Sequence, residues 1–280
     1  MSAHHEAIEQ FKSAMLEYGI SPPDNIIPDG ALHRFKIDGK LNGWYSLHLD
    51  GRAAGSFSDW KQATKEKWKL DGDFKPFTDA ERLAFAKQRH ADEAQRNAEQ
   101  LAKHQAAADK VRYIWSQAAP AINHPYLTTK QIEAHGARVG VDGRLIIPLY
   151  NANNELVNLQ FIDADGVKRF LAGGKKSGCF WWIGQKSEKI LIAEGFATAA
   201  SIHDDTGHLT IIAFDAGNLE PVAQVIRQRN PKTEMIIMAD NDISGIGQSR
   251  ARLAALATNC KYIVCPVSGM DFNDYLNKAA

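Results

Sequence analysis

Short apolar runs and amphipathic stretches alternate along the last third of the chain. Four apolar runs are expected to form buried strands: 189–193, 209–214, 235–239 and 261–265. Three intervening stretches with helical patterning are expected to form helices: about 196–205, 219–229 and 246–258. This alternation predicts an α/β domain with a parallel sheet and helices on both faces.

Two of these predicted strands end abruptly in acidic residues. Residues 189–193 lead into Glu194, and residues 235–239 lead into Asp240 and Asp242. Ligands bind at the carboxyl ends of parallel strands, so we expect these carboxylates to meet there. Such a cluster of oxygen ligands suits Mg²⁺ and a phosphate-bearing substrate. An alternative interpretation of Asp240 to Asp242 is an ordinary turn and helix N-cap.

The segment before these strands is predicted to be β-rich and basic. Residues 143–150 and 156–162 are joined by a polar turn and predict a hairpin. A glycine-rich loop follows at 173–178, and it lacks the spacing of a P-loop. Flexible glycines beside Lys175 and Lys176 suit a loop that holds a phosphate backbone or a nucleotide. The alternative for the loop lysines is a solvated hairpin loop. A short helix is expected at 126–135, closed by Gly136.

A long helix is predicted between residues 78 and 119, where the sequence has no Gly or Pro. It would run roughly 60 Å at 1.5 Å per residue. Its middle has few large apolar side chains, which predicts a solvent-exposed spacer. Its last turns carry Val111, Ile114 and Trp115, which we expect to pack against a core.

The N-terminal part is expected to be a small α+β unit. A helix is predicted at 4–18, followed by three β pieces at 31–37, 44–49 and 53–60. Basic residues interleave with aromatics in these pieces, a pattern that suits stacking on single-stranded bases. Candidates for nucleic-acid contact are Arg34, Lys36, Trp44 and Arg52. The alternative is that the aromatics form the core of the sheet, and we favour it for Trp44 and Trp60.

Composition narrows the choice of function. Lys+Arg and Asp+Glu both number 33, so any contact with nucleic acid must be local rather than a property of the net charge. The three cysteines show no zinc-ribbon spacing, so no zinc is expected and free thiols in a reducing cytosol are predicted. We find no apolar run of transmembrane length and no signal peptide, which together predict a cytoplasmic protein without a membrane partner.

A Glu-Gly strand end followed by an Asp-x-Asp strand end resembles the Toprim domain of DnaG-type primases, topoisomerases and some nucleases. Residues 143–184 also resemble the segment that precedes Toprim in these primases. Together with residues 215–219 and 271–274, the pattern is most similar to primases of phages and conjugative plasmids. The resemblance covers residues 120–280 well and the N-terminal part more loosely.

The resemblance implies four parts: a template-binding unit at 1–76, a linker helix at 77–119, a basic primase subdomain at 120–188 and a Toprim catalytic domain at 189–280. It implies Mg²⁺-dependent (or Mn²⁺-dependent) synthesis of RNA primers from NTPs on single-stranded DNA. A helicase would have to be supplied by another chain or by a region outside this sequence.

The resemblance also implies roles for individual residues. Glu194 would be a general base or metal ligand, and Asp240 and Asp242 would be catalytic metal ligands. Auxiliary metal ligands would be Asp271 and Asp274. Template or nucleotide would contact Arg144, Lys168 and Arg169.

Two positions depart from the family pattern. Thr198 stands where these primases usually carry an Asp, and Asn273 stands where the last motif often has a second Asp. The alternatives are therefore a Toprim nuclease, which would use the same metals, and a non-catalytic nucleic-acid-binding protein that retains the fold. A topoisomerase is disfavoured because no gate domains are present in the sequence.

Overall fold

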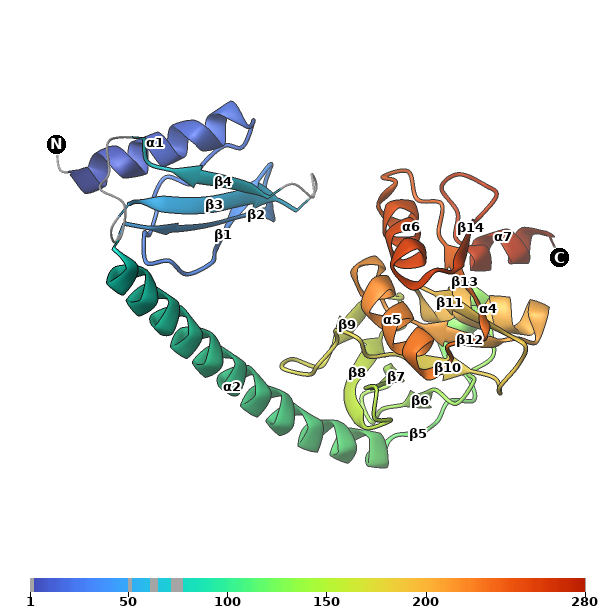
Figure 1. Cartoon of the computed structure of the whole chain (residues 1–280). Coiled ribbons are helices and arrows are strands. Elements are labelled where there is room, and N and C mark those ends of the chain that lie inside the picture. The colour runs from blue at the N-terminus through green and yellow to red at the C-terminus, as the bar shows by residue number, and fades with distance from the viewer. Residues whose placement is uncertain (1–2, 50–51, 61–64, 72–77, 280) are drawn as a thin grey trace. The chain divides into compact units, whose positions relative to one another are not determined.

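The computed structural model describes residues 3–49, 52–60, 65–71 and 78–279 (Figure 1). Internal contacts divide the chain into two compact units, Met1–Gln88 and Arg89–Ala280. Among the described helices there is none that is both long and apolar enough to cross a membrane. The four-part division expected from the sequence stays a prediction.

The N-terminal unit is one helix on one face of an antiparallel sheet. Helix α1 (Ala3–Glu17) precedes a sheet of order β1-β2-β3-β4. The strands are β1 (His33–Ile37), β2 (Lys40–His48), β3 (Ala54–Asp59) and β4 (Glu66–Lys69). Strand β4 was not predicted, because it is short and mostly charged.

One face of this sheet forms the core with α1. The ring of Phe11, fully buried, lies edge-on to Phe57 at 5.6 Å and to Trp68 at 5.4 Å between centroids. Gly55 is required beneath it, since a Cβ there would come within 2.7 Å of the Phe11 ring. Tyr45 also belongs to this core, and its side chain is on the same face of the sheet as the other core residues.

Helix α2 (Asp79–Gln117) is continuous over 39 residues, as the sequence predicted. Its described side chains before residue 104 are almost all exposed, whereas Val111 is fully buried. Val111, Ile114 and Trp115 pack against a small core with Ile146 and Leu159, so the expected docking of the last turns is confirmed.

The first part of the second unit is a five-stranded antiparallel sheet of order β5-β6-β7-β8-β9. Its strands are β5 (Ala119–Pro120), β6 (Arg138–Val139), β7 (Leu145–Tyr150), β8 (Leu156–Ile162) and β9 (Lys168–Phe170). The predicted hairpin is β7 and β8, which pair from Leu145 opposite Ile162 to Tyr150 opposite Leu156.

The helix expected at 126–135 is shorter than predicted. Helix α3 (Pro125–Lys130) ends because Gln131 adopts a left-handed conformation and its N–H bonds back to the carbonyl of Leu127. The prediction placed the stop at Gly136, five residues too late, because Gln131 carries no sequence signal for a left-handed cap.

The C-terminal part is the predicted α/β domain. Its sheet has the order β10-β12-β11-β13-β14, with every pair parallel except β10 with β12. The strands are β10 (Trp181–Ile183), β11 (Lys189–Ala193), β12 (Leu209–Ile212), β13 (Glu234–Ala239) and β14 (Lys261–Val264). The helices are α4 (Phe196–Thr206), the 3-10 turn η1 (Ala216–Asn218), α5 (Leu219–Arg229), α6 (Ile246–Thr258) and α7 (Phe272–Ala279).

Helices cover both faces of this sheet (Figure 1). Along β11, Leu191 and Ala193 belong to the core shared with α4 and the antiparallel sheet. Ile190 and Ile192 belong to the core shared with α5 and α6. A strand buried on both faces explains why residues 189–193 are continuously apolar. The arrangement leaves the carboxyl ends of β11 and β13 at a common edge.

Candidate active site

Glu194 and Asp240 occupy equivalent places on neighbouring strands. Glu194 follows β11 directly and Asp240 follows β13 directly. The two strands pair in parallel, with Ala193 opposite Met238, so both acids emerge at the same edge. The sequence prediction that the fold brings these two acids to one edge is confirmed.

These acids are close enough to perturb one another. Burial first, and then the charges of Glu194 and Asp271, raise the pKa of Asp240 to about 7. Burial also raises the pKa of Glu194, opposed by a hydrogen bond from the backbone of Ala216 and supported by the charge of Asp215. The carboxylates at this edge are therefore partly buried and close together, and both conditions disfavour their simultaneous ionisation.

Asp242 serves two purposes at this edge. Its Oδ2 accepts a 2.8 Å hydrogen bond from the N–H of Gly247 at the start of α6, and its Oδ1 accepts one of 2.5 Å from Ser244. Burial opposes its ionisation, but these hydrogen bonds prevail and hold its pKa below the usual value. The turn of the alternative interpretation is present, since the N–H of Gly245 binds the carbonyl of Asp242, but the N-cap position of α6 is Gly245 and not Asp242. The charge of Asp242 still acts on Glu194 and Asp240.

Lys168 is the cation that faces the acidic edge. It comes from β9 in the antiparallel sheet, and its Nζ lies 3.8 Å from where a Cβ of Gly195 would stand. Burial lowers its pKa, and so does the charge of Lys130, while Asp271, Glu194 and Asp240 raise it. A buried ammonium is tolerable here because the carboxylates around it compensate its charge.

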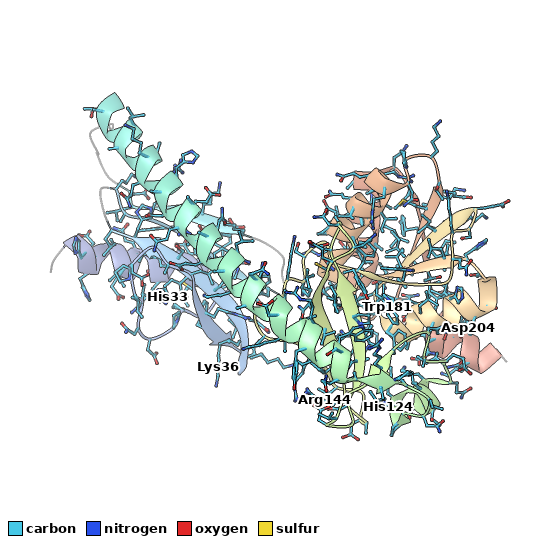
Figure 2. All side chains as sticks on the ribbon, turned by 90° about the horizontal axis from the view of Figure 1, so that it is seen from below. His33, Lys36, His124, Arg144, Trp181 and Asp204 are labelled. Carbon is cyan, nitrogen blue, oxygen red and sulfur yellow. The ribbon has the colours of Figure 1, made fainter. Side chains whose placement is uncertain are left out.

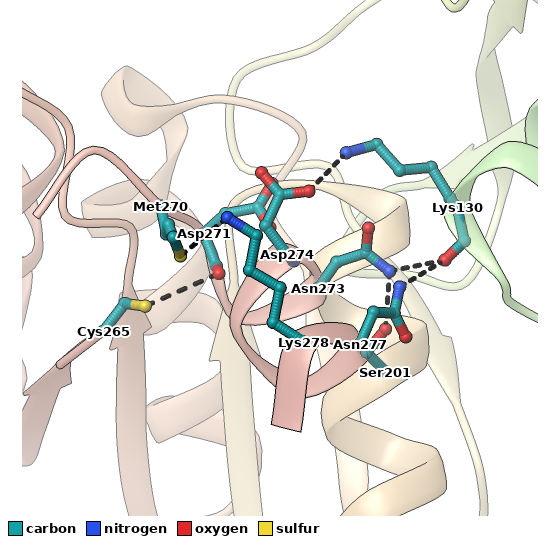
Figure 3. Close-up of polar contacts among 9 residues, drawn as sticks. All are labelled: Lys130, Ser201, Cys265, Met270, Asp271, Asn273, Asp274, Asn277 and Lys278. Atoms are coloured by element: carbon teal, nitrogen blue, oxygen red, sulfur yellow. Dashed lines mark hydrogen bonds and ion pairs between the residues drawn. The ribbon is translucent and has the colours of Figure 1, made fainter. Parts of the chain in front are cut away.

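Asp271 and Asp274 have different surroundings. Asp271 belongs with the acidic edge, because its charge reaches both Asp240 and Lys168. Asp274 instead forms a 3.0 Å ion pair with Lys130, which Figure 3 shows. The main-chain N–H of Asp274 also binds the carboxylate of Asp271 at 2.8 Å. In this structure the Asp274 carboxylate therefore pairs with Lys130 and is not grouped with the acidic edge.

A cavity of about 240 Å³ opens beside the acids. Its lining includes Tyr126, Lys130, Lys168, Thr198 and Asp271. Sequence reasoning missed Tyr126 and Lys130, since they lie on α3, far from the acids in the chain, and no motif marks them. They reach the site because α3 packs beside α4 and α7.

The residues present fit a divalent hard cation. Asp240 Oδ1 is buried and has no hydrogen-bond partner among the described residues, so it is a carboxylate oxygen left for another ligand. Glu194 and Asp271 supply further oxygens nearby. Toprim domains generally bind Mg²⁺, a cation that takes few protein carboxylates and retains waters.

The basic candidates fall on two sides of the antiparallel sheet. Successive residues of a strand point to opposite faces. Lys168 lines the cavity beside the acids, whereas Arg169 lines a second pocket of about 420 Å³ together with Arg144 and Phe161. Arg144 (Figure 2) stacks 4.2 Å from the centroid of the Phe161 ring and pairs with Asp142 at 2.6 Å. The sequence had grouped Arg144, Lys168 and Arg169 in one role.

The glycine-lysine loop is held in place by side-chain amides. Asn158 donates to the carbonyl of Lys175 at 3.2 Å, and a Cβ on Gly174 would collide with that amide at 2.4 Å. Lys176 pairs with Asp215 at 2.5 Å, and Asp215 in turn acts on Glu194. The loop thus lies near the acidic edge.

In the N-terminal unit the sheet face opposite α1 carries basic and aromatic side chains. Burial alternates along β1 and β2, so Arg34, Lys36 and Trp44 point away from the buried Phe35 and Tyr45. Lys36 of β1 is labelled in Figure 2.

The sequence prediction that Trp44 and Trp60 belong to the core of this sheet is wrong. Trp60 is 60% exposed, with the Arg34 guanidinium 5.8 Å from its ring centroid. Trp44 is half-buried, with Lys65 Nζ 5.5 Å from its ring centroid. The prediction failed because β4 supplies Trp68 to the core instead. Arg52 belongs elsewhere, since its Nε binds the carbonyl of Leu70 at 2.9 Å.

Residues 189–280 match the family model described as a Toprim domain. Fold and site agree with that match, and this part of the chain is a Toprim domain.

Relatives extend the likeness over nearly the whole chain. Two Escherichia coli proteins, both named DNA primase TraC, are 33% and 31% identical over 283 and 277 residues. Those alignments cover 94% and 91% of this chain but 19% and 26% of the relatives. The chain is therefore a relative of the TraC primases that spans a fifth to a quarter of their length. The predicted resemblance to plasmid primases is confirmed.

Solved structures include similar folds at low identity. The primase fragment of the bacteriophage T7 primase-helicase protein is 19% identical, with a TM-score of 0.44, covering 57% of this chain and 76% of that one. The DnaG catalytic core is 11% identical, with a TM-score of 0.41, covering 55% of this chain and 67% of that one.

Proposed function

We propose that the chain is a primase module that makes short RNA primers on single-stranded DNA by Mg²⁺-dependent (or Mn²⁺-dependent) nucleotidyl transfer. One observation carries the proposal: the buried Asp240, with its unpartnered oxygen, lies among the charges of Glu194, Asp271 and Lys168 at the edge of a Toprim sheet. The TraC primases that resemble the chain support the same activity.

Glu194, Asp240 and Asp271 would hold the metal, with Asp242 adding charge nearby. When bound, the ion lowers the pKa of the attacking 3′-hydroxyl and neutralises charge on the departing pyrophosphate. The raised pKa of Glu194 suits a group that accepts the proton of that hydroxyl, since a general base works best when its pKa lies near the operating pH.

Lys168 and Lys130 would orient the triphosphate. Both line the cavity beside the acids, and the charge of Lys130 lowers the pKa of Lys168. An anionic phosphate entering the cavity would relieve the repulsion between the two ammonium groups. Lys130 would then exchange its ion pair with Asp274 for the phosphate.

The template would be bound by two basic and aromatic surfaces. Arg144 and Arg169 line one pocket of the second unit. Arg34, Lys36 and Trp44 lie on the open face of the N-terminal sheet, where aromatic rings can stack on bases and cations can pair with phosphates. Duplex opening would come from a helicase, on another chain or in a region beyond these 280 residues.

The test is an assay with single-stranded DNA, NTPs and Mg²⁺, comparing the parent chain with Asp240→Asn. A matched control is Asp109→Asn, an exposed aspartate on α2. Primer synthesis by the parent and the control, and none by Asp240→Asn, is expected. Strand cleavage without synthesis would replace the proposal with a Toprim nuclease. Template binding with neither reaction would make the chain a non-catalytic binding protein.

A further inference from the structure

Three metal-ligating side chains converge on the far end of α4 from the acidic edge. They are His203 and Asp204 in the last turn of α4, and His135 in the segment between α3 and β6. One ligand atom from each lies within 4.8 Å of the other two. Figure 2 labels Asp204 at this end of the helix.

The ring of His203 is already oriented for a ligand. Its Nδ1 lies 2.7 Å from the carbonyl oxygen of His208, a bond in which the nitrogen donates. That contact fixes the tautomer and leaves the Nε2 lone pair available, the arrangement that second-shell carbonyls give to metal-binding histidines. Gly184 makes room for the ring, because a Cβ there would come within 2.4 Å of Cε1.

His135 completes the group from a constrained backbone position. It adopts a left-handed conformation with φ of 46°. Its Nε2 lies 3.0 Å from Asp204 Oδ1, and its ring lies edge-on to His203 with centroids 5.5 Å apart. The following Gly136 packs on Trp181, which anchors the turn to the core.

We propose that His135, His203 and Asp204 form a zinc site distinct from the acidic edge. Two imidazoles and a carboxylate suit Zn²⁺, whereas Mg²⁺ prefers oxygen ligands alone. Zn²⁺ with bonds of roughly 2.0–2.1 Å requires ligand atoms closer together than 4.8 Å, a change that small side-chain rotations supply. The fourth position is left for water.

Bound zinc would join the segment after α3 to the end of α4. His135 and Asp204 are 69 residues apart in sequence, so the ion would cross-link the antiparallel subdomain to the Toprim domain. The sequence prediction of no zinc rested on cysteine spacing alone, and this proposal departs from it. The site is independent of the proposed primase activity.

The test is a Zn²⁺ titration against a chromophoric chelator, in excess Mg²⁺ to occupy the acidic edge. The parent for this test carries His4→Ala and His5→Ala, which remove an adjacent pair of histidines near the N-terminus. We expect about one Zn²⁺ per chain at micromolar concentrations. His135→Asn and Asp204→Asn should each weaken binding about tenfold or more. Asn at 135 tolerates the left-handed backbone.

The matched control is His208→Gln, since His208 contributes only its main-chain carbonyl. It should bind Zn²⁺ as the parent does. Zn²⁺ should also raise the melting temperature of the parent and of this control, but not of the two ligand variants. Absence of binding to the parent, or equal binding to the parent, His135→Asn and Asp204→Asn, would overturn the proposal. Circular dichroism of each variant without metal shows whether a loss of Zn²⁺ binding is caused by misfolding. Asp204→Asn is the variant expected to disturb folding least, because the Asp204 side chain is 42% exposed.

Discussion

The side-chain amide of Asn273 donates a 2.7 Å hydrogen bond to the main-chain carbonyl of Lys130, across 143 residues of sequence. The same nitrogen also donates to Ser201 Oγ at 2.8 Å (Figure 3), and Asn273 is fully buried. An amide can serve both acceptors, whereas an ionised carboxylate can serve neither. The departure from the family's second aspartate is therefore explained by packing of α7 on α3 and α4.

Asn273→Asp should consequently destabilise the fold. Loss of the buried donor costs about 1–3 kcal/mol, and more when the replacement is charged. A buried Asp would have a raised pKa in the folded state, so the loss should grow as pH rises above its unfolded value near 4. Urea denaturation at pH 5 and pH 8 measures this, with Asn277→Asp as the partly exposed control that binds the same carbonyl. An equal effect at both pH values would contradict the account.

Asp240→Asn should have the opposite effect on stability when no divalent metal is present. The folded pKa of Asp240 is raised to about 7, so the folded state holds its proton more tightly than the unfolded state does. Ionisation thus destabilises the fold progressively as pH rises from about 4 to 7, and the penalty is constant above that. The substitution should stabilise by about 1–4 kcal/mol at pH 8 and by less at pH 5.

Chelator-treated protein is the sample for that measurement, and denaturant midpoints at the two pH values are compared. Added Mg²⁺ should stabilise the parent more than the Asp240→Asn variant, because the ion compensates the carboxylates only where they are all present. A variant less stable than the parent at pH 8 in chelator would contradict this prediction, because it would mean that the ionised Asp240 stabilises the fold.

The strands and helices of the Toprim domain could be predicted because their signal is local. Continuous apolar runs such as 189–193 indicate strands buried on both faces, and acids directly after them mark one edge. The strand β10 and helix α7 were missed. β10 is three residues long, and it is held by antiparallel pairing with β12, a contact no local pattern encodes.

Only some residues of the site could be predicted, because a local sequence pattern does not show which distant segments pack together. Glu194 and Asp240 follow strands of one sheet, so topology brings them together. Lys130 and Tyr126 enter from α3 through tertiary packing. The opposite directions of Lys168 and Arg169 required knowing that β9 is a strand at that register, since the sequence shows only two adjacent basic residues.

Because Lys168 and Arg169 point in opposite directions, we expect their single substitutions to have different effects. A double substitution would not distinguish those effects. Lys168→Ala should sharply reduce primer synthesis, because it removes the buried cation facing the acids, and should leave the salt dependence of template binding unchanged. Arg169→Ala should lower the slope of log affinity against log salt by about 1, as expected for one lost phosphate contact. Fluorescence anisotropy over a salt series and a primer assay are run on both variants.

Lys232→Ala is the control for both measurements, because this exposed lysine lies in the turn before β13, at the opposite end of the strand from Asp240. It should change neither quantity. If Lys168→Ala lowers the salt slope and Arg169→Ala does not, the two side chains have the reverse roles.

The N-terminal sheet provides the last prediction. Trp44 and Trp60 lie outside the core of their unit, and each has a cation near its ring, Lys65 and Arg34 respectively. A half-buried or exposed tryptophan beside a cation is a surface on which an unpaired base can stack while its phosphate pairs with the charge. Trp44→Ala and Trp60→Ala should each weaken binding of single-stranded DNA by about 1–3 kcal/mol.

The control for these substitutions is Leu41→Ala, which removes an exposed apolar side chain of β2 on the face opposite Trp44. Affinity is measured by anisotropy with an unstructured oligonucleotide, and primer start sites are mapped in parallel. The tryptophan variants should lose affinity or start-site preference, while the melting temperature stays near that of the parent because neither ring fills the core. Should all three variants bind and initiate like the parent, the open face of this sheet does not contact the template, and its aromatic residues serve a partner other than DNA.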